Sequence, residues 1–225
     1  MTTTGDWCEK ALRYQFSDED LLTQALTHRS ASANNNERLE FLGDALLGLA
    51  IAGAIFDLKP DADEGALSRY RSDLVRGESL ADIARRLDIG SRLIMGSGEH
   101  RTGGHQRSSV LANALEALMG AILIDGGFEA ARHSVLHVFE DRLLSLPAES
   151  DLKDPKTRLQ ELLQAQQLPP PVYSLVRASG ADHARNFEAN CSIEALDIAT
   201  TGRGTSRRRA EQMAALAALD HLNDE

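Results

Sequence analysis

Several residue types are scarce in this sequence, and each shortage excludes a class of protein. The chain of 225 residues holds two cysteines, Cys8 and Cys191, far apart in sequence, so a disulfide-built domain is excluded and reduced thiols are expected. No uninterrupted apolar run reaches the roughly 18 to 20 residues that a membrane span needs. The opening MTTTGDWCEK lacks the apolar centre of a signal peptide. We therefore expect a cytoplasmic protein with no membrane partner.

Aromatic residues and positive charge are scarce as well. Aromatics make up 4% of the chain while alanine and leucine dominate, which favours helix. The formal net charge of −10, taken alone, argues against a nucleic-acid partner. The charge is uneven, however, because residues 198–210 contain four arginines and no acid. A local basic face of this kind can bind phosphates on a protein that is acidic as a whole.

Two parts of different character are predicted, joined by a linker at residues 147–154. The stretch LPAESDLKDP around it, residues 146–155, has two prolines and four charged residues and is poor in apolar residues. Residues 1–146 show helical periodicity in one segment after another, which predicts an all-α domain. The predicted helical segments are Asp20–Leu26, Leu39–Phe56, Gly65–Leu87, Val110–Ile124 and Ala130–Leu144. Residues 155–225 predict a small α+β domain of the order α-β-β-β-α, with the third strand at Leu196–Thr201.

A group of acids stands out in the first part. In NERLEFLGDALLGLA, helical spacing brings Glu37, Glu40 and Asp44 within an arc of about 60°. The same run continues as an apolar stretch on every side, which predicts a buried helix. A second segment, SVLANALEALMGAILID, is apolar on every face except at Asn113 and Glu116, which stand three residues apart and share a face.

Burying several carboxylates together costs several kcal/mol unless a partner compensates their charge. Arg38 is the obvious cation nearby in the sequence. A divalent metal would resolve the conflict, and an all-oxygen ligand set suits Mg²⁺, with Mn²⁺ able to substitute. Individual residues have alternative roles as well. Any single Glu could form a salt bridge or face a subunit interface, Glu64 could be an acid that stabilises a helix start, and Phe41 is either a core aromatic or a knob for a second subunit.

These motifs together resemble the ribonuclease III family. Four segments fall in the order that the family has them: ALTHRSAS at 25–32, NERLEFLGDALL at 36–47, DEGALSRYRSDLVRG at 63–77 and VLANALEALMGA at 110–121. The second part resembles a double-stranded RNA-binding domain. The resemblance implies an all-helical nuclease domain (residues 1–146) that acts as a homodimer, followed by a domain (residues 155–225) that binds duplex RNA.

The resemblance also assigns roles to the acids. The family coordinates Mg²⁺ at the positions of Glu40, Asp44 and Glu116, and usually has Asp where this chain has Asn113. Further acids that assist cleavage stand in the family at the positions of Glu37 and Glu64, so the catalytic set comprises Asp44, Glu116, Glu37 and Glu64. The aromatic that inserts into the partner subunit matches Phe41.

The chemistry implied is hydrolysis of a phosphodiester by a metal-activated water, with no nucleophilic side chain and no organic cofactor. Two sites, one for each strand, would leave 5′-phosphate and 3′-hydroxyl ends with two-nucleotide 3′ overhangs. Ribosomal RNA precursors and other structured transcripts are the family's usual substrates. Because Asn113 lacks the charge of Asp, an alternative stays open: a protein with a weakened site that binds duplex RNA without cutting it and regulates transcripts by occupancy.

The segment GRGTSRRRAEQMAA predicts a phosphate-binding helix start. Either Thr205 or Ser206 could cap the helix, and the three arginines at 207–209 then fill its first turn, where the helix dipole prefers negative charge. A phosphate would suit both the arginines and the backbone N–H groups there. The family's Gly-x-Gly-x-Ser-basic-basic pattern is matched by Gly202, Gly204, Ser206, Arg207 and Arg208. The resemblance further implies that Gln160, Glu161 and His183 reach the minor grooves of the duplex, which is read by its A-form shape and 2′-hydroxyls.

Overall fold

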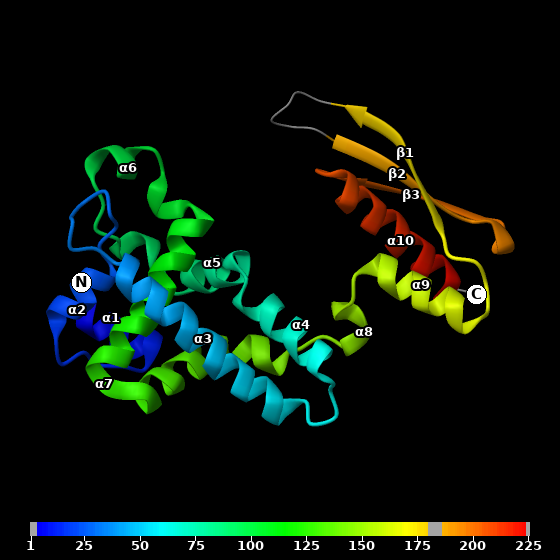
Figure 1. Cartoon of the computed structure of the whole chain (residues 1–225). Helices are drawn as coiled ribbons and strands as arrows, with labels where there is room; N and C mark the ends of the chain where they lie inside the picture. Colours follow the sequence, from blue (N-terminus) through cyan, green and yellow to red (C-terminus); the bar gives the residue numbers. More distant parts are fainter. Residues whose placement is uncertain (1–3, 180–185, 224–225) are drawn as a thin grey trace. The chain divides into compact units, whose positions relative to one another are not determined.

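The computed structural model describes residues 4–179 and 186–223, and it divides into two compact units, residues 1–147 and 148–225 (Figure 1). The first unit contains the helices α1 (Thr4–Leu12), α2 (Glu19–Ala25), α3 (Glu37–Leu58), α4 (Glu64–Val75), α5 (Gly77–Arg86), α6 (Ser97–Arg101) and α7 (Ser108–Leu144). The second contains α8 (Glu149–Leu152), α9 (Pro155–Ala165), β1 (Val172–Ser179), β2 (Asn186–Ile193), β3 (Ile198–Gly204) and α10 (Arg207–Asn223). The predicted fold class, a helical domain followed by a small α+β domain, is confirmed.

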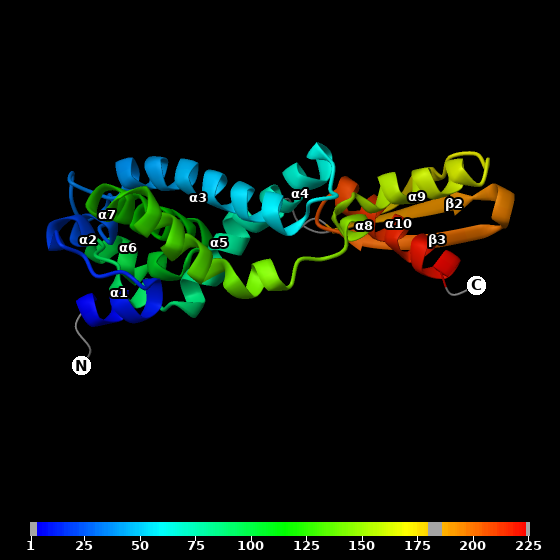
Figure 2. The same cartoon turned by 90° about the horizontal axis from the view of Figure 1, so that it is seen from below.

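The core of the first unit is the packing of α3 against α7, which lie side by side (Figures 1 and 2). Fully buried Leu and Ile side chains of α7, including Leu115, Leu118 and Ile122, fill the space between α7 and its neighbours. Each such side chain stabilises the fold by roughly 1.5 to 3 kcal/mol relative to an exposed position. The helix α3 ends at Leu58, because Pro60 disfavours helical backbone at the residue before it.

The prediction that the acid-bearing helix is buried is only half right. One side of α3 packs in the core, but Phe41, Leu49 and Phe56 are 80%, 61% and 68% exposed. These three positions fall within an arc of about 80° on the helix, so they form a single apolar stripe. The stripe is exposed to solvent in the single chain. The sequence of a helix that is apolar on every side does not indicate which side is left exposed, so the prediction did not include this stripe.

Two helices, α3 and α7, are long and apolar enough to cross a membrane when judged by length and composition alone. Core helices of soluble proteins have the same character, and the most apolar window of α7 is 61% buried inside the fold. The expectation that the protein has no membrane partner stays a prediction.

The helices predicted for the first unit omit α1 and α6 and differ from the structure at one further place. The single segment predicted at Gly65–Leu87 is two helices, α4 and α5, because the backbone of Arg76 is extended (φ −64°, ψ 149°). The two segments predicted before and after residue 127 are confirmed as two helical stretches of α7, because Gly127 between them has a non-helical backbone. Gly127 has φ +78°, a value that glycine adopts without steric cost, so the chain bends there and then resumes the helix.

The second unit is a three-stranded antiparallel sheet in the order β1-β2-β3, with α9 and α10 packed on one face (Figure 2). Its core holds Leu159 and Leu163 from α9, Cys191 from β2 and Leu219 from α10. Strand β3 begins and ends later than predicted, and Leu196 belongs to a 3₁₀ turn before it. Both cysteines of the chain are buried free thiols, as expected.

Candidate functional site

The first candidate site lies where the backbones of α3 and α7 come closest. A Cβ added to Gly43 would overlap the carbonyl oxygen of Glu116, and one added to Gly120 would overlap the carbonyl oxygen of Leu39. Only glycine on both helices allows this approach. It brings the carboxylates that flank Gly43 on α3 opposite Glu116 and Asn113, which lie one and two turns before Gly120 on α7.

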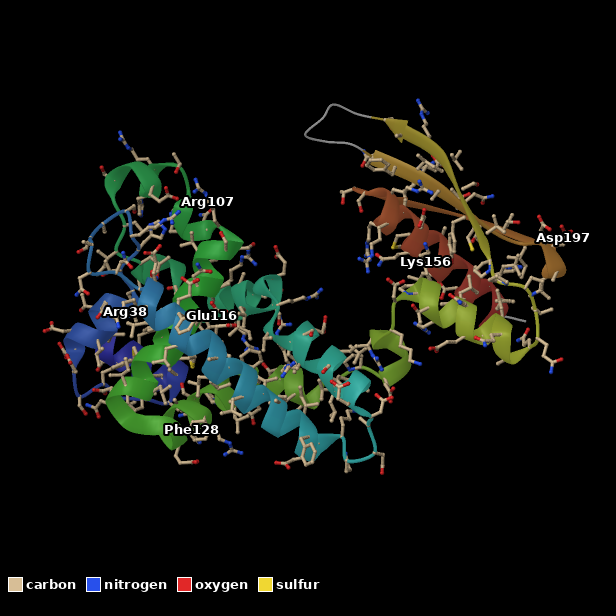
Figure 3. All side chains as sticks on the ribbon, viewed as in Figure 1. Arg38, Arg107, Glu116, Phe128, Lys156 and Asp197 are labelled. Carbon is tan, nitrogen blue, oxygen red and sulfur yellow. The ribbon has the colours of Figure 1, made fainter. Side chains whose placement is uncertain are left out.

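The acids predicted to cluster do influence one another electrostatically. Burial and, to a smaller extent, the negative charges of Asp44 and Glu40 together raise the pKa of Glu116 to about 7. Glu116 lies in α7 beside α3 (Figure 3). Three carboxylates therefore share a small, partly desolvated space, and their mutual repulsion favours binding of a proton or another cation.

Glu40 and Asn113 form the second link between the two helices. Burial raises the pKa of Glu40, the charges of Glu37 and Asp44 add to that effect, and a hydrogen bond from the Asn113 side chain opposes it. The charge of Arg29 also lowers the pKa of Glu40. The cation next to the cluster is thus Arg29 from the loop before α3, whereas Arg38, the cation expected from the sequence, lies at the start of α3 with an exposed side chain (Figure 3).

The donor set fits a hard divalent cation. Glu40, Asp44 and Glu116 offer carboxylate oxygens and Asn113 offers an amide oxygen, which are the ligands that Mg²⁺ and Mn²⁺ prefer. Among the residues that the structure describes, no group of three His, Cys, Asp or Glu side chains lies ready to hold a metal ion. The predicted ligand set therefore rests on the convergence of the two helices and on the repulsion that raises the pKa of Glu116.

A cavity of about 370 Å³ opens beside the cluster. Its lining includes His28, Arg29, Glu37, Glu40, Ser109 and Asn113. Nη1 of Arg29 lies 3.5 Å from Oε1 of Glu37. The guanidinium of Arg29 therefore contacts this predicted catalytic acid, and both residues line the cavity. The first turn of α7 also lines the cavity, and no side chain caps that helix start.

Glu64 does not join the cluster within the chain. It opens α4 beyond the far end of α3, so it is separated from Glu40 by most of a 22-residue helix, roughly 25 to 30 Å. There it has the local role of a helix-start acid: Asp63 caps α4, and Oε1 of Glu64 accepts a hydrogen bond from the Ser68 hydroxyl at 2.8 Å.

The second candidate site is the start of α10. Ser206 caps this helix, because its Oγ accepts the backbone N–H of Arg209 at 3.1 Å. The two glycines of the motif permit close packing of β3 on α10, since a Cβ on Gly202 would overlap the backbone of Ala214 and one on Gly204 would press on the backbone next to Arg209. The glycines thus serve packing, and the arginines are the groups that face solvent.

Carboxylates hold the arginines of α10 in place. Nε of Arg207 lies 2.9 Å from Oε1 of Glu211, and Nη2 of Arg208 lies 3.6 Å from Oδ2 of Asp154. Lys156 donates a hydrogen bond to Glu211, and this bond is the main reason that the pKa of Glu211 lies below its ordinary value. The side chain of Arg207 is 63% exposed and that of Arg208 is 82% exposed, so both can still bind a phosphate.

Of the three other residues predicted to contact RNA, the structure describes Gln160 and Glu161. Gln160 and Glu161 lie on the exposed side of α9, and Glu161 forms an ion pair with Lys153 at 2.8 Å. His183 lies outside the described residues. The sequence interpretation assigned no role to His28 or Arg29, or to the glycines at 43 and 120. A signal for the glycines was present, because each stands three or four residues from an acid on an otherwise apolar helix.

Comparisons with known proteins agree with this geometry. A family model described as Ribonuclease-III-like matches residues 18–143, and a double-stranded RNA binding motif matches residues 155–222. A curated Ribonuclease 3 of Alkalilimnicola ehrlichii is 48% identical over 224 residues, which cover 100% of this chain and 98% of the relative. One from Xylella fastidiosa is 51% identical over 215 residues, which cover 96% of this chain and 95% of the relative.

The crystal structure of the nuclease domain of a ribonuclease III from Campylobacter jejuni aligns with 65% of this chain and 100% of its own, with a TM-score of 0.61 and 39% identity. These matches do not favour the alternative of a duplex-RNA binder that fails to cut. They cover the cluster between α3 and α7 as well as the basic start of α10. The chain therefore belongs to the ribonuclease III family of double-strand-specific endoribonucleases.

Proposed function

We propose that this endoribonuclease cuts duplex RNA with Mg²⁺ held by Glu40, Asp44, Asn113 and Glu116, and that it does so as a homodimer. The observation that carries the proposal is the close approach of α3 and α7, which sets Glu40 and Asp44 against Glu116, so that burial and the repulsion between the carboxylates raise the pKa of Glu116. A divalent cation relieves that repulsion better than a proton does, because it interacts with all of the carboxylates at once.

Each residue of the cluster has a role in this scheme. Glu40, Asp44 and Glu116 supply negative charge to hold the ion, and the Asn113 amide offers an oxygen without adding charge. When bound, Mg²⁺ lowers the pKa of a coordinated water and stabilises the leaving 3′ oxygen. Mn²⁺ has similar ligand preferences and should substitute. The products would carry 5′-phosphate and 3′-hydroxyl ends.

The homodimer is supported by the apolar stripe of Phe41, Leu49 and Phe56. An exposed apolar stripe of this size marks an interaction surface, and Phe41 stands next to Glu40 in the sequence, so the interface would adjoin the cluster. If two copies of α3 pack antiparallel about a two-fold axis, the end of α3 in one copy lies near its start in the other. Glu64 of one copy would then approach the cluster of the second copy, and Glu37 would assist at its mouth.

Two clusters in such a dimer would each serve one strand, which accounts for staggered cuts with two-nucleotide 3′ overhangs. The domain at residues 155–225 would deliver the duplex through Arg207, Arg208 and Ser206 on α10, with Gln160, Glu161 and His183 reaching the minor grooves. We place the enzyme in the cytoplasm, where ribosomal RNA precursors and other structured transcripts are its substrates.

A cleavage assay on a long, perfectly paired RNA tests the proposal directly. The parent chain should give short duplex products whose yield rises with Mg²⁺, and Glu116→Ala should give none while still binding the RNA. Glu78→Ala, an exposed acid on α5, is the matched control and should cut like the parent. Tight binding by the parent without products at any Mg²⁺ or Mn²⁺ concentration would overturn the proposal.

A further inference from the structure

We propose that His28 and Arg29 form a phosphate-binding subsite, which holds a backbone phosphate of the RNA strand next to the phosphodiester that is cut. The inference deepens the proposed function and rests on it for the position of the cut. The subsite is the part of the lining of the 370 Å³ cavity that the loop between α2 and α3 contributes.

The loop that carries the two side chains is fixed by the rest of the unit. The backbone N–H of His28 donates to the carbonyl of Ile94 at 2.9 Å. The N–H of Gly96 donates to Oγ of Ser30 at 3.0 Å. A Cβ on Gly96 would overlap the Ser30 carbonyl, so glycine is required for this close approach. All of these contacts join the loop to the segment at residues 94–96, so the backbone around His28 and Arg29 is fixed, as a binding site requires.

Hydrogen bonds fix the tautomer of His28. The backbone N–H of Ser30 can only donate, and it lies 3.2 Å from Nδ1 of His28, so Nδ1 is the acceptor. Oγ of Ser30 lies 2.8 Å from the same atom, and with Nδ1 as the acceptor the hydroxyl is the donor of this bond too. In neutral His28 the ring proton must then be on Nε2. The ring lines the cavity and thus offers one N–H donor whose direction is set by the loop.

Arg29 supplies the charge of the subsite. Its side chain is 71% exposed, and its contact with Glu37 is long, at 3.5 Å, between two solvated groups. A pair of solvated groups at this distance adds little to the stability of the fold. A phosphodiester offers two oxygens in the geometry that a guanidinium binds through parallel hydrogen bonds, so RNA would take Arg29 from Glu37.

The electrostatics of the site call for a cation at this position. A phosphodiester that enters the cavity approaches Glu37 and Glu40, and both repel it. An ion bound by the cluster offsets this repulsion on one side only, for the phosphate that is cut. Arg29 and His28 also line the cavity, where they would attract the neighbouring phosphate and set the strand in register with the cluster.

Binding of a 24-base-pair RNA duplex tests the role of Arg29. The titrations use the full chain with Glu116→Gln, in Mg²⁺, so that the RNA stays intact, and they are repeated over a range of salt concentrations. Adding Arg29→Ala should raise Kd about tenfold at physiological salt and lower the slope of log K against log salt by about one. Arg38→Ala removes a neighbouring exposed cation outside the cavity lining and should change neither by as much. Equal effects of the two substitutions would overturn the subsite.

Two substitutions separate a direct role of His28 from a structural one. His28→Gln places an amide donor near the position of Nε2 but loses the acceptor for Ser30, whereas His28→Asn keeps an acceptor near Nδ1 and loses the donor. If His28 is part of the subsite, His28→Gln should bind RNA with a Kd within threefold of the parent's, and His28→Asn should bind severalfold more weakly. Thermal unfolding should show that both variants are folded. The opposite order would show that His28 only holds the loop, and would overturn its place in the subsite.

The outcome for the subsite is separable from the outcome for the proposed function. If the parent chain fails to cleave RNA in Mg²⁺, the proposed function falls, while the comparison of Arg29→Ala with Arg38→Ala still measures whether this loop binds a phosphate.

Discussion

The carboxylates between α3 and α7 and the arginines at the start of α10 are both groups of like charge, but their surroundings differ. The carboxylates are brought together by two helices whose backbones touch, and burial and mutual repulsion raise the pKa of Glu116 to about 7. The arginines lie on one exposed helix turn, and Glu211 and Asp154 pair with two of them. The carboxylates therefore repel one another when no cation is bound, whereas ion pairs offset the charge of two of the arginines.

The difference indicates how each group meets its partner. Carboxylates that two packed helices hold close together repel one another, and a cation that binds them removes this repulsion, so the affinity for a cation comes from the fold. Exposed arginines release bound counterions when they bind phosphates, so their affinity depends strongly on salt. Under the proposed function, the chain thus separates a site for an ion from a surface for a duplex.

The largest expected effect comes from separating the two helices. Gly43→Ala should destabilise the fold by roughly 2 to 3 kcal/mol, because a Cβ there overlaps the Glu116 carbonyl, and it should abolish cleavage. Urea unfolding and the cleavage assay measure the two effects. Gly53→Ala, on the same helix with nothing within 4 Å of the added Cβ, is the matched control and should be neutral or slightly stabilising. Similar losses for both would mean that the close approach is not required.

Removal of the exposed arginines should affect binding without affecting the fold. Arg207→Ala with Arg208→Ala should weaken duplex RNA binding about tenfold to a hundredfold and lower the salt slope by about two. The thermal unfolding midpoint should change little, since surface ion pairs contribute between 0 and about 1 kcal/mol. Lys10→Ala, an exposed cation on α1, serves as the control. Unchanged RNA affinity would exclude this helix start from the interface.

A third substitution adjusts the charge of the cluster. Asn113→Asp adds a negative charge where the amide now donates to Glu40. The metal-free protein should become less stable, and the Mg²⁺ concentration for half-maximal cleavage should fall severalfold. Thermal unfolding without metal and a Mg²⁺ titration of the rate measure both changes. An unchanged or higher Mg²⁺ requirement would count against Asn113 as a ligand.

The smallest effect is expected from the acid that balances the arginines. The Lys156 hydrogen bond holds the pKa of Glu211 below its ordinary value of 4.5, so the folded state binds a proton less readily than the unfolded state. The stability that Glu211 contributes is present above about pH 4.5 and is lost as the pH falls through the folded pKa. The difference in unfolding midpoint between the parent and Glu211→Gln should therefore shrink in acid. Glu194→Gln, at an exposed position, should show no such trend.

Sequence patterns predicted the order of the elements but not how close they come. Apolar periodicity and the change of pattern after residue 154 were enough for a helical part followed by α-β-β-β-α. The break at Arg76 was missed, because it depends on a backbone conformation that neighbouring residues do not determine. The open side of α3 was missed because a helix that is apolar all round gives no direction.

The sequence predicted which residues make up the candidate site, but not the contacts that hold them in place. Helical spacing grouped the acids of α3 and paired Asn113 with Glu116, since both patterns are local. The contact of Gly43 with Gly120, and the approach of Arg29 to Glu37, join residues far apart in the chain. Spacing carries no information on such contacts, so Arg38 was named as the neighbouring cation instead of Arg29.

The effect of Mg²⁺ on thermal unfolding tests, without RNA, whether the cluster between α3 and α7 holds a divalent cation. The midpoint of the parent should rise with Mg²⁺, because an ion that binds only the folded state stabilises it. Glu116→Gln should unfold at a higher temperature than the parent in the absence of metal, because the repulsion is reduced, and should gain much less from Mg²⁺. An equal rise for both proteins would contradict the account.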